Sequence, residues 1–343
     1  FATLDEALAA RDFDRAHVLV PPPLHEAIAG ALLKCGVSVL CEKPLATTSE
    51  GSQNLLTLAQ ENGAILGTNQ NYLFNPAFRE LLKQVQSHTH GKLRHVICTY
   101  NMPLRQLAGK QMSHWMFDTP LNMLLEQAVH PLSLIRALIG EVRDVTATAP
   151  DGTLISPGVE LFTTSNITLE GTESDAQLHF AVGREFPFWQ IMAVCDDGVI
   201  TADLIANRAF TLGRTRFPEF VDAFLSGRKM AKKILFRSGA NAANYLLSLF
   251  HLKQRSDPFY LSMAGSIRDF HDAVSAGRNP ESDGAFGADL VRISEEITAQ
   301  AFPAAPGVAR PAPKAPEGKS DVMLLGGTGF IGKHTVRKLL DAG

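Results

Sequence analysis

The chain has 343 residues, of which 45% are apolar and 20% charged, and its formal net charge is −3. This composition is typical of a globular protein large enough for two domains, and it offers no basic surface for nucleic acid. No apolar run approaches the roughly 20 residues that span a bilayer. The four cysteines, Cys35, Cys41, Cys98 and Cys195, form no C-x-x-C pair. They favour a cytoplasmic protein with reduced thiols over a disulfide framework or a metal site.

The first segments predict a parallel α/β unit. Strands are expected at 17–20, 37–41 and 64–68, and helices at 24–34 and between Thr47 and Asn62. Gly36 is placed to end the first helix, and Thr47 with Glu50 forms a capping box that begins the second. Strands that alternate with helices through short connections predict a right-handed parallel sheet covered on both faces.

After a helix at 76–86 the pattern changes to alternating apolar and polar residues. Strands of a mainly antiparallel sheet with one wet face are expected at 92–101, 141–150, 160–171, 175–183, 188–196 and 198–205. A helix at 120–139 interrupts them, and helices at 266–277 and 288–302 follow. The apolar "YLLSLFHL", preceded by the basic "RKMAKKILFR", is a helix packed on the domain or on a partner subunit, or a helix on a membrane surface.

The last residues predict a linker and the start of another domain. Residues 303–320 are rich in Ala and Pro, and a strand, a glycine loop (Gly326, Gly327, Gly329, Gly332) and a helix follow at 321–343. Such a loop suits a pyrophosphate at a helix N-terminus, although a plain glycine turn is the simpler alternative. "GGTGFIG" resembles the opening of extended short-chain dehydrogenases, the nucleotide-sugar epimerases and dehydratases, which implies a second NAD-binding Rossmann domain.

Two strand ends, "VPPPLH" and "CEKPLA", carry polar residues where ligands of open parallel sheets bind. Pro44 fixes the backbone after Lys43, so the lysine is held in a turn. A lysine held there can donate to a hydroxyl and stabilise a developing alkoxide. Taken alone, Lys43 fits a solvated surface lysine equally well.

These motifs resemble those of the Gfo/Idh/MocA oxidoreductases. "VLVPPPLH", "GVSVLCEKPLA", "NQNYLFNPAFRELL", "GKLRHV", "HPLSLIRALIG" and "SIRDFHDAVSAGRNP" follow in the order of that family, from about Leu4 to Phe302. The resemblance implies the latter part of a dinucleotide-binding Rossmann domain at 1–75 and an α+β substrate and dimerisation domain at 76–302. It further implies NAD or NADP as cofactor, hydride transfer at a carbinol carbon of a sugar, cyclitol or related polyol, and a homo-oligomer formed through the open sheet face.

The resemblance also assigns site residues. Lys43 is expected at the nicotinamide ribose and the reacting hydroxyl, while Pro21, His25, Glu42 and Pro44 line the cofactor cleft, Pro44 after a cis peptide. "EQAVH" places Glu126 and the acid/base His130 four residues apart. On one helix face, the carboxylate would orient or charge the imidazole, and a surface ion pair is the alternative.

Further polar and aromatic residues are candidates without a family assignment. Asn69 and Asn71 follow the third strand and are placed to reach the nicotinamide or the substrate. His114 and Trp115 suit contact with a sugar ring or, alternatively, loop packing.

The chain departs from the family pattern in ways that leave a second function open. Glu126 replaces an Asp, Ala128 a glycine, and Ser133 an Asp of the family motif. The family's own glycine loop is not among these residues, so we expect an N-terminally truncated fragment that binds dinucleotide poorly and is inactive alone. The alternative to an enzyme is a catalytically weakened substrate-binding or assembly scaffold for the epimerase-like domain.

Overall fold

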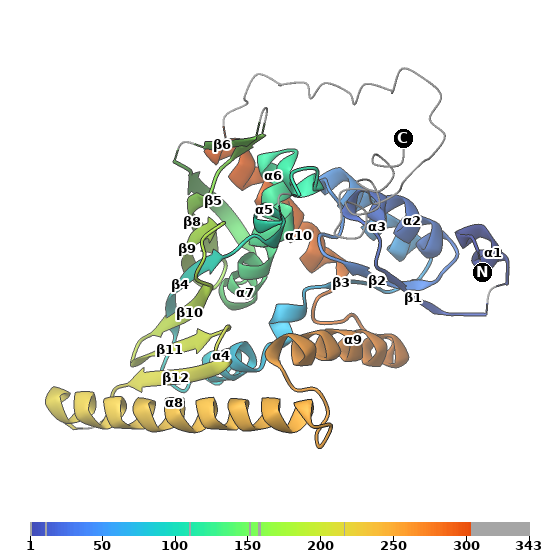
Figure 1. Cartoon of the computed structure of the whole chain (residues 1–343). Helices are drawn as coiled ribbons and strands as arrows, with labels where there is room; N and C mark the ends of the chain where they lie inside the picture. The colour runs from blue at the N-terminus through green and yellow to red at the C-terminus, as the bar shows by residue number, and fades with distance from the viewer. Residues whose placement is uncertain are drawn as a thin grey trace, which may run out of the picture.

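The computed structural model describes residues 2–302, apart from 11, 110, 151, 157, 158 and 216. Its elements form two α/β units, with the N-terminal unit on the right of Figure 1. The linker and the glycine loop predicted at 303–343, including Gly326, Gly329 and Gly332, lie outside the described residues.

The first unit is a three-stranded parallel sheet in the order β1-β2-β3. Its elements are α1 (Leu4–Ala10), β1 (Arg15–Val18), the 3₁₀-helix η1 (Pro22–Leu24), α2 (His25–Lys34), β2 (Ser38–Glu42), α3 (Ser49–Glu61) and β3 (Leu66–Asn69). The predicted helix stops are confirmed, because Gly36 and Gly63 adopt φ values of 72° and 62°, which glycine reaches without strain. The expected parallel sheet is therefore present.

The predicted capping box of α3 is wrong by one residue. Thr48, not Thr47, is the N-cap, and its hydroxyl oxygen accepts a hydrogen bond from the N–H of Gly51 at 3.0 Å. Because α3 begins at Ser49, Glu50 stands one position too early to complete the box.

The second unit is built on a seven-stranded sheet in the order β12-β11-β10-β4-β9-β8-β5. Its strands are β4 (Leu93–Met102), β5 (Val142–Thr148), β8 (Thr164–Gly171), β9 (Asp175–Val182), β10 (Phe188–Cys195), β11 (Gly198–Asp203) and β12 (Arg208–Gly213); β6 (Thr153–Ser156) and β7 (Val159–Leu161) form a separate hairpin. Only β4 and β9 pair in parallel among these described strands, so the expected mainly antiparallel sheet is confirmed.

Helices cover one face of this sheet. They are η2 (Asn71–Phe74), α4 (Pro76–Gln86), α5 (Arg105–Ala108), η3 (Trp115–Phe117), α6 (Pro120–Met123), the π-helical turn η4 (Leu124–Ala128) and α7 (Val129–Ile139). Phe78, Phe180 and Trp189 are among the largest fully buried side chains between the layers. The opposite face carries a shallow hollow of about 320 Å³ whose lining includes Thr99 and His179.

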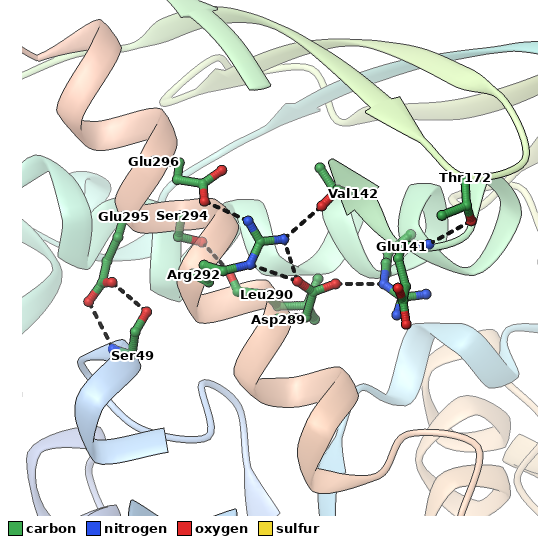
Figure 2. Close-up of polar contacts among 11 residues, drawn as sticks. Ser49, Glu141, Val142, Thr172, Asp289, Leu290, Arg292, Ser294, Glu295 and Glu296 are labelled. Atoms are coloured by element: carbon green, nitrogen blue, oxygen red, sulfur yellow. Dashed lines mark hydrogen bonds and ion pairs between the residues drawn. The ribbon is translucent and has the colours of Figure 1, made fainter. Parts of the chain in front are cut away.

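The last two described helices bring the chain back to the first unit. α9 (Pro258–Ala276) packs on β2 and β3, and α10 (Gly284–Ala301) packs on α3 and β3 as well as on β5 and α7. Figure 2 shows Glu295 of α10 accepting hydrogen bonds from the N–H and the hydroxyl of Ser49 at the start of α3. On the other side of α10, Arg292 donates to the carbonyl of Val142 at 3.0 Å. The buried apolar residues form two clusters, one from Val18 to Leu66 and one from Leu73 to Ala301, and α10 makes polar contacts to both units.

A long helix, α8 (Glu219–Leu249), runs along the bottom edge of Figure 1 beneath β12 and α4. None of its described residues is buried. No helix in the described part of the chain is long and apolar enough to cross a membrane.

Candidate active site

The end of β2 carries the lysine singled out by the sequence. Lys43 directly follows Glu42, and the Lys43–Pro44 peptide is cis, as expected. His25, at the start of α2, is fully buried beneath this turn. Its Nδ1 lies 2.7 Å from the carbonyl oxygen of Pro44 and its Nε2 lies 2.9 Å from that of Val20. His25 thus links the two strand ends and positions the lysine turn from below, whereas the sequence placed it on the cleft wall.

Lys43 reaches across to the second unit. Its Nζ donates a hydrogen bond to the backbone oxygen of Glu126 at 2.8 Å and lies 3.4 Å from the Glu126 Oε1. Both side chains are largely buried, with 15% and 19% of their surfaces exposed. A lysine held in this way is not a solvated surface lysine. Since an ammonium has three N–H donors, these two contacts leave one donor for a further acceptor.

Glu126 does not orient His130. It lies in the π-helical turn Leu124–Ala128, and the Nδ1 of His130 has no hydrogen-bond partner among the described residues. The carboxylate pairs with Lys43 instead. The expected pairing of Glu126 with His130 is therefore replaced by an ion pair between the two units.

His130 is the second residue of α7 and is buried against the ring of Tyr72, with the ring centroids 5.0 Å apart. Burial lowers the pKa of His130 well below 6.5, and the positive charge of Lys43 lowers it further. Its Nδ1 has no hydrogen-bond partner among the described residues. A neutral imidazole with an unused nitrogen can take up a proton from a ligand. Lys43 donates to the backbone oxygen of Glu126, four residues before His130, so the two predicted catalytic groups lie near each other.

The end of β3 supplies buried amides next to this pair. Asn69 donates a hydrogen bond from its Nδ2 to Glu42 Oε1 at 2.7 Å. The Oδ1 of Asn69, the Oε1 of Gln70 and the Nδ2 of Asn71 are buried and have no partner among the described residues. Buried polar atoms are normally hydrogen-bonded, so this set of donors and acceptors fits a polar ligand. A nicotinamide carboxamide and ribose hydroxyls have the complementary groups.

Aromatic residues that the sequence did not single out form the wall beside His130. The Tyr72 ring packs edge-on against Trp189 at 4.6 Å, and Trp189 packs against Tyr100 at 5.0 Å. The Tyr100 hydroxyl donates to Gln127 Oε1 at 2.9 Å. Among the site residues that the sequence analysis did not name, only Gln70 and Tyr72 had a local signal, because they belong to the unbroken polar run "NQNY" at a strand end.

The remaining candidates are Pro21, His114 and Trp115. Pro21 is exposed and precedes the 3₁₀-helix η1. The Nδ1 of His114 accepts a hydrogen bond from the N–H of Met116, which caps η3, and Trp115 packs on the core. Loop packing therefore accounts for His114 and Trp115. No group of three His, Cys, Asp or Glu residues within the described ranges is arranged to hold a metal ion.

Two family models match the chain. The model described as "Oxidoreductase family, NAD-binding Rossmann fold" matches residues 1–70, in agreement with the expected NAD or NADP cofactor. The model described as "GFO/IDH/MocA C-terminal domain" matches residues 78–201.

Curated relatives are similar over part of their lengths. A dTDP-3,4-didehydro-2,6-dideoxy-alpha-D-glucose 3-reductase of Streptomyces violaceoruber is 28% identical over 201 residues, which are 58% of this chain and 57% of the relative. The scyllo-inositol 2-dehydrogenase (NADP(+)) IolU of Bacillus subtilis is 26% identical over 209 residues, 60% of this chain and 61% of the relative. The chain thus spans about three fifths of these relatives.

Solved structures share the fold. The WlbA dehydrogenase from Bordetella pertussis, in complex with NADH and UDP-GlcNAcA, superposes with a TM-score of 0.66 at 18% identity and covers 88% of this chain and 81% of its own. At this identity the likeness concerns the fold alone.

Proposed function

The chain belongs to the Gfo/Idh/MocA oxidoreductase family, and from this premise we propose that it transfers a hydride between NAD or NADP and a carbinol carbon of a sugar, cyclitol or nucleotide-sugar-like substrate. One observation carries the proposal: Lys43 of the first unit donates to the backbone of the second unit at Glu126, four residues before His130, and buried amide groups without partners among the described residues follow β3. The relatives named above reduce or oxidise a nucleotide-linked deoxysugar and an inositol, which supports this substrate class.

The bound nicotinamide ring supplies or accepts the hydride. In the oxidation direction, neutral His130 takes the proton of the substrate hydroxyl through its unpartnered Nδ1. Lys43 donates its remaining N–H to the same oxygen and stabilises the negative charge that develops there. In the reduction direction, protonated His130 returns the proton to the alkoxide. Glu126 holds the ammonium in place through its carboxylate and its backbone oxygen.

Residues at the strand ends hold the reacting partners. Asn69, Gln70 and Asn71 present both donors and acceptors to the nicotinamide ribose and carboxamide. Glu42 fixes the orientation of Asn69, and His25 fixes the turn that carries Lys43. We assign Glu42, Pro44 and Asn71 to the cofactor side of the cleft, while His25 acts through the Lys43 turn.

The test is turnover, by the product of the full coding sequence, of a panel of sugars, cyclitols and nucleotide sugars, followed by nicotinamide absorbance with NAD and with NADP. Lys43→Met and His130→Gln should each lower kcat/KM by about 100-fold or more. Lys34→Met is the matched control, because Lys34 is an exposed lysine of α2 remote from the cleft. Unchanged turnover in both site variants would refute the assignment. Substrate binding without any cofactor turnover in the wild type would favour the scaffold instead.

Two further parts of the expected function have their own tests. We propose that a second copy of the chain covers the open sheet face around Thr99 and His179; sedimentation of the wild type and of a Thr99→Arg variant would test it. The fused epimerase-like domain rests on "GGTGFIG" alone, and the coding sequence that follows Gly343 would decide whether it exists.

A further inference from the structure

Helix α8 (Glu219–Leu249) is attached to the body of the protein through its polar side. Ser226 donates to the carbonyl of Gly213 at 3.0 Å, and Asn241 donates to the carbonyl of Ala206 at 3.0 Å. Between them, Lys233 and Arg237 both pair with Glu80 of α4. These contacts fix which side of α8 faces β12 and α4.

The opposite side of α8 is apolar and faces solvent. Phe220, Phe224 and Leu235 have exposed fractions of 76%, 65% and 75%, and Leu246 and Leu249 continue the same side of the helix at 54% and 57%. A surface helix ordinarily turns its apolar side to the core and its polar side to water. In α8 the apolar side faces solvent instead. The helix lies at the edge of the molecule, where this side has no neighbouring element in the described part of the chain (Figure 1).

The exposed apolar surface is large for a monomer. Phenylalanine side chains offer roughly 150–250 Å² each, so these five residues together present on the order of several hundred Å². Phe236, Phe250 and Leu252 extend it, each more than 70% exposed. An exposed apolar row along one side of a helix indicates a surface that binds something.

The helix and the residues that follow it are rich in cations. Residues 223–256 contain seven Lys and Arg and no Asp or Glu. Arg228, Lys229 and Lys232 are exposed, and no carboxylate among the described residues pairs with them. They lie within the apolar stretch between Phe224 and Leu235.

These charges decide between two possible occupants. A second copy of α8 would bring the same acid-free stretch against itself, and would bury or oppose cations without any counter-charge, which is costly. An anionic lipid surface offers acyl chains to the apolar side chains and phosphates to the cations at the same time. We propose that α8 binds in the plane of an anionic membrane, with Phe220, Phe224 and Leu235 at the headgroup–acyl boundary and Arg228, Lys229 and Lys232 on lipid phosphates. The inference is independent of the oxidoreductase activity.

The experiment is co-sedimentation of the purified protein with vesicles of phosphatidylcholine, with or without phosphatidylglycerol, at low and high salt. Binding is expected on the phosphatidylglycerol vesicles and should weaken at high salt. Each cation near such a surface raises the affinity for the membrane roughly fivefold. The triple variant Arg228→Gln/Lys229→Gln/Lys232→Gln should therefore bind about 100-fold more weakly. Phe220→Ser/Phe224→Ser/Leu235→Ser should abolish binding.

The matched control is Lys34→Gln/Arg143→Gln/Arg184→Gln, which removes three exposed cations from other elements and should bind as the wild type does. Far-ultraviolet circular dichroism would show that each variant is folded, which we expect because the replaced side chains point away from the body. The proposal is overturned if the wild type does not bind phosphatidylglycerol vesicles, or if the control weakens binding as much as the α8 variant. It is also overturned if the wild type is a dimer that does not bind vesicles and the apolar variant is a monomer, because α8 then binds a second copy.

Discussion

Acidification should destabilise the protein through His130. The side chain is half-buried, and its pKa is held well below 6.5 by burial and then by the charge of Lys43. In the unfolded chain the same imidazole is solvated and titrates near 6.5. The two states therefore bind different numbers of protons over the range between these values.

Between the two pKa values the unfolded state carries one more proton than the folded state. This difference decides whether the free energy of unfolding rises or falls with pH. Above about pH 6.5 both states are neutral at this site, and its contribution to folding is fully present. As the pH falls below that value, the unfolded state gains a proton that the folded state cannot accept, so the free energy of unfolding decreases. For one proton the slope is about 1.4 kcal/mol per pH unit, and it continues until the folded pKa is reached.

The assay is urea unfolding followed by tryptophan fluorescence, since Trp189 is buried beside Tyr72. Wild type, His130→Gln and His88→Gln would be compared from about pH 8 to about pH 5. His88 is an exposed histidine in the turn that follows α4, and its replacement should leave the wild-type slope unchanged. His130→Gln should remove the contribution of one proton from the slope, about 1.4 kcal/mol per pH unit. If His130→Gln and wild type lose stability in parallel, His130 is not the half-buried neutral group described here.

Further predictions concern stability, measured by urea or thermal unfolding. Lys43→Met and Glu126→Gln should show a coupling of about 1–3 kcal/mol in a double-mutant cycle, because their ion pair is largely buried; strictly additive effects would contradict the pair. Asn75→Ala should cost about 1 kcal/mol, since its Oδ1 caps the first turn of α4, and an unchanged midpoint would exclude that cap. Gly140→Ala should cost about 1–3 kcal/mol, as φ is 79° and the added Cβ would lie 2.1 Å from the nearest side-chain oxygen. Gly277→Ala, also at positive φ but with nothing within 4 Å, should cost less; equal losses would argue against the clash.

Much of the local structure was predictable because its causes are local. The helix at 76–86 begins at a proline and is α4 as expected, and Gly36 and Gly63 end their helices with positive φ. The strands of the second unit alternate between buried and exposed residues, which the sequence displays directly. Thr47 was mistaken for Thr48 because adjacent threonines offer the same hydroxyl to a helix start.

The contacts that define the site were beyond local patterns. The π-helical turn around Glu126 has the apolar spacing of an ordinary helix, so the sequence paired Glu126 with His130. Its actual partner, Lys43, lies 83 residues away and meets it only through the packing of two units. In the same way, the sequence of α8 shows a polar and an apolar side, but which one faces the body depends on Glu80 and the end of β12.

The return of α9 and α10 to the first unit means that the chain crosses between its two halves twice. A single cut in the connection between β3 and α4 would leave the halves joined, with Glu295 still bound to Ser49 and the backbone of Thr68 still bonded to Ser282. A hinge-like separation of the two units would therefore have to bend two connections and break the contacts of α10 with Ser49 and Val142.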